Sequence, residues 1–412
     1  MTSAHSLVEP AVQKPRERSG FWTVAYAFLV VMAFATLPSP LYGLYRTRDH
    51  LSALMITVIY AIFAGGTIAS LLAVPRVAAR IGRRGVMLSS VATMMVSAGL
   101  LAAWKALPGL LVGRLITGVS VGLAAGTAIA YLIELRLRAD PNASIVRAQT
   151  IGTSVTVGGL GIGALIGGLL AQWGKLQLTL PYLVFVALGA IALAGLWFVP
   201  ETGTLTPRTT ASPKAGRSAR LPIPAAAGTL AAFAANGLFA GLAGLFLATT
   251  FHHPSHALSG ATLFLVFSCG VLSQLMTAKL QSAGVLALGT TSMLVGLALL
   301  VVSVRLPNPN LAMFLISGAL IGGGAGAVFK GTTGIVLQSS PPERRLAMTS
   351  DLLIALYVGL SVPVVGAGIA LDQGATAPNT VLGFAILVGL GVFVSGAALL
   401  LGRRRRDSGP SV

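Results

Sequence analysis

The chain has 412 residues, of which 55% are hydrophobic and only 9% are charged, and its formal net charge is +18. Soluble domains carry about 25% charged residues, so a water-soluble protein of this length could not cover its surface with so few charges. The composition therefore indicates a membrane protein and excludes a soluble globular one. The single cysteine, Cys269, also excludes an internal disulfide and a cysteine-based metal cluster.

Apolar runs long enough to cross a membrane recur along the chain. A bilayer core of about 30 Å needs roughly 20 apolar residues as a helix. Six spans are expected at 22–45, 52–75, 86–104, 109–134, 148–172 and 179–199, and six more at 223–250, 257–278, 283–304, 309–337, 347–371 and 379–402. The fold class we predict is an all-α polytopic membrane protein with twelve transmembrane helices in two six-helix bundles.

A long polar break separates the two sets of spans. Its sequence, "PETGTLTPRTTASPKAGRSARLPIP", is rich in Pro, Thr, Ser and basic residues, which is typical of a solvated linker. We therefore predict an N-terminal tail over 1–21, a first bundle over 22–199, a linker over 200–222, a second bundle over 223–402 and a basic tail over 403–412.

Positive charge is distributed unevenly along the chain. Most of the 28 Lys and Arg lie in the N-terminal tail, in the loops that follow even-numbered spans, and in the C-terminal tail. Because loops rich in Lys and Arg stay cytoplasmic, we expect a multi-pass protein of the plasma (inner) membrane with both termini cytoplasmic. The positive net charge of the chain then reflects the orientation of its loops in the membrane. The expected partners of this monomer are the lipid bilayer and a small-molecule substrate, with no nucleic acid.

The two halves match each other at a constant offset of 200 residues. "TGVSVGLAAG" over 117–126 lies over "SGALIGGGAG" over 317–326. The paired glycines are Gly118, Gly122 and Gly126 with Gly318, Gly322 and Gly326, and the same offset pairs Gly159 with Gly359 and Gly168 with Gly368. Repeated six-span halves indicate a transporter whose site lies between them. Small residues every fourth position also let membrane helices pack closely, and we expect both to hold.

The basic stretch "PRVAARIGRRG" lies between the second and third spans. Such a cluster can be a nucleic-acid patch, a membrane-surface anchor or part of a moving gate. It is similar to the loop motif Gly-x-x-x-Asp-Arg-x-Gly-Arg-Arg of the major facilitator superfamily. The matching residues are Arg80, Gly82, Arg83 and Arg84, whereas Pro75 and Ala79 stand where the motif has Gly and Asp.

Two further motifs extend this resemblance. "RLITG", Arg114 to Gly118, resembles the Arg-x-x-x-Gly motif of the drug:proton antiporter families of that superfamily. Gly159, Gly163, Gly167 and Gly168 match the motif Gly-x-x-x-Gly-Pro-x-x-Gly-Gly, with Ala164 in place of Pro. The resemblance implies a proton-coupled exporter of drug-like or secondary-metabolite molecules that works by alternating access. It implies no cofactor, with the proton gradient as energy source.

The basic loop has two acidic candidates at its own depth. Glu134 lies at the inner end of the fourth span, and Asp351 near the inner start of the eleventh. Because Ala79 removes the motif's own acid, we expect Arg80, Arg83 or Arg84 to pair with Glu134 and Asp351 when the cytoplasmic side closes. Simple anchoring at the membrane surface is the alternative.

Few other ionisable groups lie inside spans, where charges are costly and mark functional candidates. For Arg114 the resemblance implies a role in proton coupling, and the alternative is a side chain that reaches the outer headgroups. Lys330 presents a cation either to an anionic substrate or to Glu134, or reaches the inner surface. Asn236, Tyr131 and Tyr357 are candidate pocket residues.

Neither the coupling proton nor a metal site is assigned by these residues. No Asp or Glu lies in the outer half of any span, so Glu134 and Asp351 are the best-placed proton carriers. His252, His253 and His256 cluster in one outer loop and could sense pH or bind a metal weakly. Without neighbouring carboxylates or Cys, an ordinary solvated loop is expected, and no metal.

Two alternatives to an exporter follow from the same residues. An importer, symporter or facilitator of a small, anionic solute is supported by Arg114 and Lys330. A membrane-embedded enzyme would need several catalytic groups at one depth, and the ionisable span residues are scattered, so we expect no enzyme.

Overall fold

The computed structural model describes residues 15–202, 221–341 and 344–407, and the regular elements in these segments are helices. The first half contains α1 (Pro15–Thr36), the short η1 (Ser39–Leu41), α2 (Tyr42–Asp49), α3 (Ala53–Ala103), α4 (Leu107–Ala125), α5 (Ala128–Ala139), α6 (Ile145–Trp173) and α7 (Leu180–Trp197). The second half contains α8 (Ile223–Thr249), α9 (His256–Met276), α10 (Ser282–Arg305), α11 (Leu311–Gln338), α12 (Arg345–Asp372) and α13 (Ala377–Asp407).

Eleven stretches of helix in the described segments are long and apolar enough to cross a membrane. One of them, α3, has 51 residues and contains a non-helical residue, Gly82. At about 1.5 Å per residue, α3 is more than twice as long as a bilayer core is thick, so it supplies two spans. The predicted fold class, with twelve spans, is therefore confirmed.

Two predicted spans are not continuous helices. The first, predicted over 22–45, ends at Thr36 and continues as η1 and α2, because Pro38 and Pro40 lack the N–H groups that a longer helix would need. The fourth, predicted over 109–134, is divided between α4 and α5 at Gly126 and Thr127. At the chain ends, α1 begins within the predicted tail, and α13 continues past residue 402. Residues 203–220 of the predicted linker lie outside the described residues.

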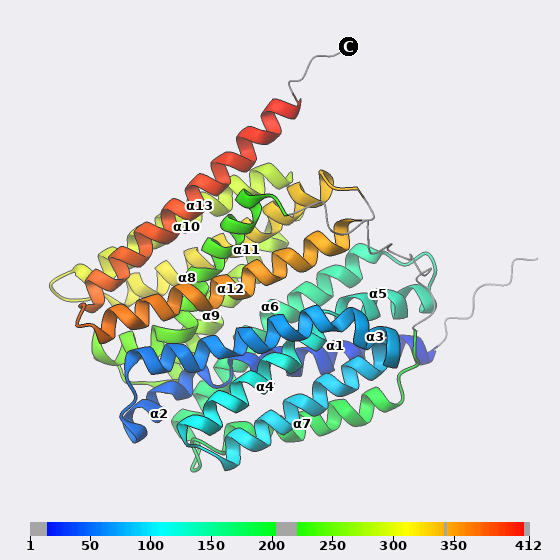
Figure 1. The fold of residues 1–412 in the computed structure, drawn as a ribbon, viewed down its shortest axis with the longest axis horizontal. Coiled ribbons are helices and arrows are strands. Elements are labelled where there is room, and N and C mark those ends of the chain that lie inside the picture. The colour runs from blue at the N-terminus through cyan, green and yellow to red at the C-terminus, as the bar shows by residue number, and fades with distance from the viewer. Residues whose placement is uncertain (1–14, 203–220, 342–343, 408–412) are drawn as a thin grey trace, which may run out of the picture.

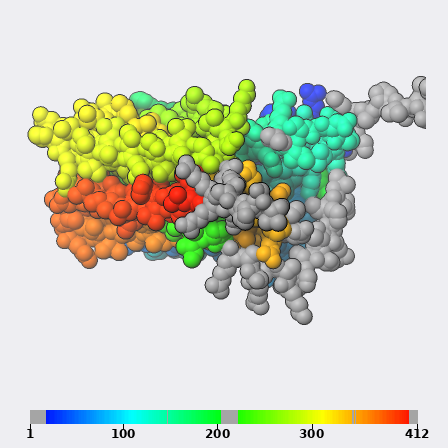
Figure 2. Space-filling model, turned by 90° about the horizontal axis from the view of Figure 1, so that it is seen from above, coloured from blue at the N-terminus to red at the C-terminus, as the bar shows by residue number. Residues whose placement is uncertain are grey.

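The helices run side by side, with α1–α7 and α8–α13 on different sides of the molecule (Figure 1). In the view turned by 90°, the yellow and red surfaces of the second half lie on the left and the teal surface of the first half lies on the right (Figure 2). We call the end that carries Gly82, Glu134, Glu201 and Ile223 the basic end. The opposite end, which carries α2 and the start of α9, is called the far end.

Repeat-related glycines make corresponding contacts in the two halves. A Cβ at Gly122 would overlap the carbonyl oxygen of Thr67 on α3, and a Cβ at Gly322 would overlap that of Val266 on α9. These glycines therefore let α4 approach α3, and α11 approach α9, at backbone contact. The offset of 200 residues therefore relates packed pairs of helices in the two halves, and not only matching amino acids.

Gly163 is the tightest test of this packing, because a Cβ there would overlap the carbonyl oxygen of Ala33 on α1. We expect Gly163→Val to lower the free energy of unfolding by about 1–3 kcal/mol or to prevent folding, as overpacking does. The matched control is Gly158→Val, whose Cβ would meet nothing within 4 Å. Thermal unfolding in detergent compares the two variants, and equal midpoints would contradict the packing role.

Candidate functional site

The basic loop between the spans of α3 breaks at Gly82, which has φ 73° and ψ 175°. The second span of α3 therefore begins at Arg83, and its first backbone N–H groups need acceptors from elsewhere. The Glu201 carboxylate supplies them: it accepts from the backbone N–H groups of Arg83 and Arg84, both at 3.0 Å. A Cβ at residue 82 would lie 2.5 Å from this carboxylate, so only glycine fits both the positive φ and the contact.

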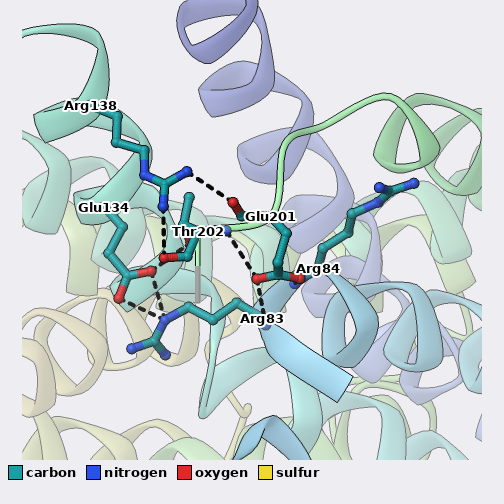
Figure 3. A network of polar contacts seen from close by, with 6 residues as sticks. All are labelled: Arg83, Arg84, Glu134, Arg138, Glu201 and Thr202. Carbon is teal, nitrogen blue, oxygen red and sulfur yellow. Dashed lines mark hydrogen bonds and ion pairs between the residues drawn. The ribbon is translucent and has the colours of Figure 1, made fainter. Parts of the chain in front are cut away.

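The Arg83 side chain forms an ion pair with Glu134 on α5. Its Nε donates to the two carboxylate oxygens at 2.7 and 2.8 Å. The Thr202 hydroxyl donates to the same carboxylate at 2.6 Å, so the nearly buried Glu134 has partners on two sides. Figure 3 shows this network, with Glu201 on the other side of Thr202.

The segment after α7 is fastened to the same place. The Arg138 guanidinium donates to the backbone carbonyls of Glu201 at 2.9 Å and Thr202 at 3.0 Å. Arg84 donates to the Trp197 carbonyl and lies over the ring of that residue, with its guanidinium carbon 5.6 Å from the ring centroid. The Tyr131 hydroxyl donates to the Pro200 carbonyl at 2.7 Å, so this predicted pocket residue belongs to the network instead.

This network lies wholly within the first half. Of the pairs predicted for a closed cytoplasmic side, the structure contains Arg83–Glu134. Arg80 is exposed and has no partner among the described residues, and the half-buried Asp351 on α12 has none among them either. Glu201, which is not among the predicted site residues, instead accepts from the backbone N–H groups of Arg83 and Arg84.

Arg114 lies in the interior of the first half, with 1% of its surface exposed, so it does not reach headgroups. Its Nη1 donates to the Ala35 carbonyl at 2.7 Å, at the point where α1 ends. Its guanidinium carbon lies 4.8 Å from the centroid of the Phe63 ring. Nε and Nη2 of Arg114 have no hydrogen-bond partner among the described residues, and no carboxylate there pairs with it.

The remaining predicted site residues lie in the second half. Lys330 donates to the Gln274 carbonyl at 2.6 Å and to the Thr277 hydroxyl at 3.2 Å, both near the end of α9, and not to Glu134. Tyr357 is buried and packs edge-to-face on Phe63 across the interface, with ring centroids 6.0 Å apart. Asn236 is buried on α8, and its side-chain oxygen has no partner among the described residues.

The halves meet along α6 and α9 from the far end to the middle of the molecule. Gly168 lies against Gly260, and a Cβ added at Gly270 would lie 3.7 Å from the Val157 side chain. Thr153, on the same face of α6 one turn nearer the basic end than Val157, is exposed. The two ion pairs of the described chain, Arg48–Asp49 and Arg83–Glu134, both lie within one half. Along α6 and α9 the halves are therefore in contact from the far end to Val157, and this contact ends at the exposed Thr153.

Comparison with known proteins agrees with this architecture. The family model of the Major Facilitator Superfamily matches residues 24–283. The chain belongs to the major facilitator superfamily. This membership makes it a multi-pass membrane transporter of small molecules and not an enzyme. No curated protein sequence matches the chain significantly.

Two solved structures share the fold of this superfamily member at low identity. A crystal structure of a D-xylose-proton symporter has a TM-score of 0.73 and 16% identity, and covers 93% of this chain and 97% of its own. A crystal structure of a mutant of the nucleoside transporter NupG has a TM-score of 0.66 and 11% identity, and covers 93% of this chain and 99% of its own. At these identities the similarity concerns the fold alone.

The sequence offered one signal for the residues that were missed. The chain has only 10 Asp and Glu, so each acid beside a basic loop is a potential partner, and Glu201 directly follows the sixth span. Gln172 and Asp372 are related by the repeat offset of 200.

Among the described residues, no group of three or more His, Cys, Asp and Glu could hold a metal ion.

Removal of the Arg83 side chain should destabilise the first half, because Glu134 would remain nearly buried with only Thr202 as partner. We expect Arg83→Ala to lower the free energy of unfolding by about 1–3 kcal/mol. Arg80→Ala is the matched control, since the exposed Arg80 has no described partner, and it should change stability by less than about 0.5 kcal/mol. Thermal unfolding in detergent measures both, and equal losses would refute the role of the Arg83–Glu134 pair.

Proposed function

We propose that this transporter takes up a small solute bearing an anionic group, coupled to protons, by alternating access. The observation that carries the proposal is the asymmetric contact between the halves, which touch from the far end to Val157 and part at Thr153. A site between two halves that meet at one end is what alternating access requires. The positive-inside distribution of Lys and Arg supports a cytoplasmic basic end, so this state would be open to the cytoplasm.

Uptake is favoured over export by two considerations. The proteins of the same fold include, by their titles, a proton symporter for D-xylose and a nucleoside transporter. The export reading depended on the glycine motif of the fifth span. In the structure Gly159 and Gly163 lie against α1, Gly167 lies against Leu37 just after it, and Gly168 lies against α9. This is a packing role that either direction of transport can use.

The anionic character of the solute is inferred from the cations of the interior. Arg114 is buried without a carboxylate partner, and Lys330 bonds only to a carbonyl and a hydroxyl. An uncompensated buried cation is costly, so an anionic group that approaches it gains more than it would at the surface.

Asp351 is the proton carrier in this proposal. Glu134 is already bonded to Arg83 and Thr202. Asp351 is half-buried on α12 and has no hydrogen bond among the described residues, so it is free to change its protonation state between the two conformations. In the alternate state Arg80, which is also without a described partner, is the candidate to pair with it across the basic end.

Transport by reconstituted vesicles tests the direction and the solute class. We expect an acid-outside pH gradient to drive accumulation of one of a panel of small radiolabelled carboxylates, sugars and nucleosides, with a carboxylate preferred. Lys330→Gln should raise the KM for the carboxylate about tenfold or more, and Lys330→Arg should restore it. Gradient-driven extrusion of ethidium from cells, without accumulation of any panel member, would favour the exporter instead.

The coupling role of Asp351 has a separate test. Asp351→Asn should abolish accumulation driven by the pH gradient but retain solute exchange between equal pools, because exchange needs no net proton movement. Asp49→Asn, at the far end, is the matched control and should leave both intact. Normal gradient-driven accumulation by Asp351→Asn would show that another group carries the proton.

A further inference from the structure

Gln172 and Asp372 occupy corresponding places in the two halves. They are separated by the repeat offset of 200 residues. Gln172 lies at the far end of α6, which ends at Trp173, and Asp372 ends α12. Neither residue belongs to the network at the basic end or to the interior cations.

Each of these side chains accepts hydrogen bonds from the first turn of a helix in the other half. The Gln172 side-chain oxygen accepts from the backbone N–H groups of His256 at 2.9 Å and Ala257 at 3.4 Å, where α9 begins. The Asp372 carboxylate accepts from the backbone N–H of Leu54 at 3.3 Å, where α3 begins. Ala257 and Leu54 are each the second residue of their helix, and such N–H groups have no acceptor within it.

A glycine four residues earlier accompanies each of the two side chains. A Cβ at Gly168 would lie 2.5 Å from the His256 carbonyl oxygen, and a Cβ at Gly368 would lie 3.1 Å from the Leu54 Cα. A spacing of four places the glycine and the polar residue on one face of the helix. The glycine lets that face approach the other half, and the side chain beyond it then reaches the free N–H groups.

We propose that these two Gly-x-x-x-Gln/Asp units are paired latches that hold the far end closed, and that Gln172 and Asp372 set the balance between the two states of the transporter. This inference rests on the proposed alternating access. Because the hydrogen bonds join one half to the other, they form only while the far end is closed. Their removal therefore shifts the population toward the state that is open there.

The two latches differ in strength. Gln172 is half-buried and also accepts from the Ser255 hydroxyl at 3.3 Å, and the neighbouring His256 ring nitrogen Nδ1 lies 3.2 Å from the Pro40 carbonyl oxygen. Asp372 is exposed and accepts one hydrogen bond from the other half, although its charge is favoured at a helix N-terminus. We expect loss of Gln172 to have the larger effect, and Gln172→Glu to add a favourable charge to the stronger latch.

Two engineered cysteines report the two ends of the full-length protein in detergent, after Cys269→Ala removes the native thiol. Ser39→Cys is the far-end reporter, because Ser39 is 5% exposed and precedes Pro40 at the latch. Thr153→Cys is the basic-end reporter, because Thr153 is exposed where the halves part. The rate of labelling by a fluorescent maleimide is measured at each.

We expect Gln172→Ala and Asp372→Ala to raise labelling at the far-end reporter by about three- to tenfold, the order of a lost helix cap. The same variants should lower labelling at the basic-end reporter, and the double variant should exceed either one. Gln172→Glu should slow far-end labelling. Gln373→Ala and Asp49→Asn are matched controls near the latches and should change neither rate. A general loosening of the fold would instead raise labelling at both reporters.

Gly260→Trp separates failure of the latches from failure of the proposed function. Gly260 packs against the backbone of Ala164 and Gly168, so a large side chain there must force the far end apart. If Gly260→Trp shifts the two reporters in opposite directions but the latch variants do not, the latch proposal is overturned and alternating access stands. If Gly260→Trp does not shift them reciprocally, the proposed alternation itself fails.

Discussion

A helix that ends or breaks within a packed membrane protein leaves backbone N–H and C=O groups that lipid cannot hydrogen-bond. In this chain, four such helix ends form hydrogen bonds with side chains from other helices or from the beginning of the linker. Glu201 accepts from the start of the second span of α3, Arg114 donates to the end of α1, and Gln172 and Asp372 accept from the starts of α9 and α3. At the Gln172 and Asp372 contacts, Gly168 and Gly368 let the two backbones approach closely enough for the hydrogen bonds to form.

These four contacts divide into two kinds with different consequences for transport. Glu201 and Arg114 bond within the first half, so their contacts can persist while the halves move and keep that half rigid. Gln172 and Asp372 bond across the interface, so in the proposed cycle theirs would break as the far end opens. The proposed alternating access would use both kinds, because rigid halves transmit a local change from one end of the molecule to the other.

The basic loop shows which features of the network residue spacing alone can predict. The run Arg80 to Arg84 and its position between two spans are readable in the sequence, as is the depth of Glu134. That Arg83 rather than Arg80 reaches Glu134 depends on the direction the chain takes after the left-handed Gly82. Glu201 is not predicted as a site residue because its neighbours in sequence belong to a polar linker. Only folding brings the beginning of that linker next to Arg83 and Arg84, where the second span of α3 starts.

The sequence by itself determined the membrane class, the twelve spans, the repeat and its family resemblance, because hydrophobic length and residue spacing are local properties of the chain. It did not determine where helices break or which side chains meet across them. Those contacts join residues as distant as Leu54 and Asp372, and they depend on how far glycines such as Gly368 let two backbones approach. Which end of the molecule is closed was decided by the tertiary structure alone, because both states of a transporter share one sequence.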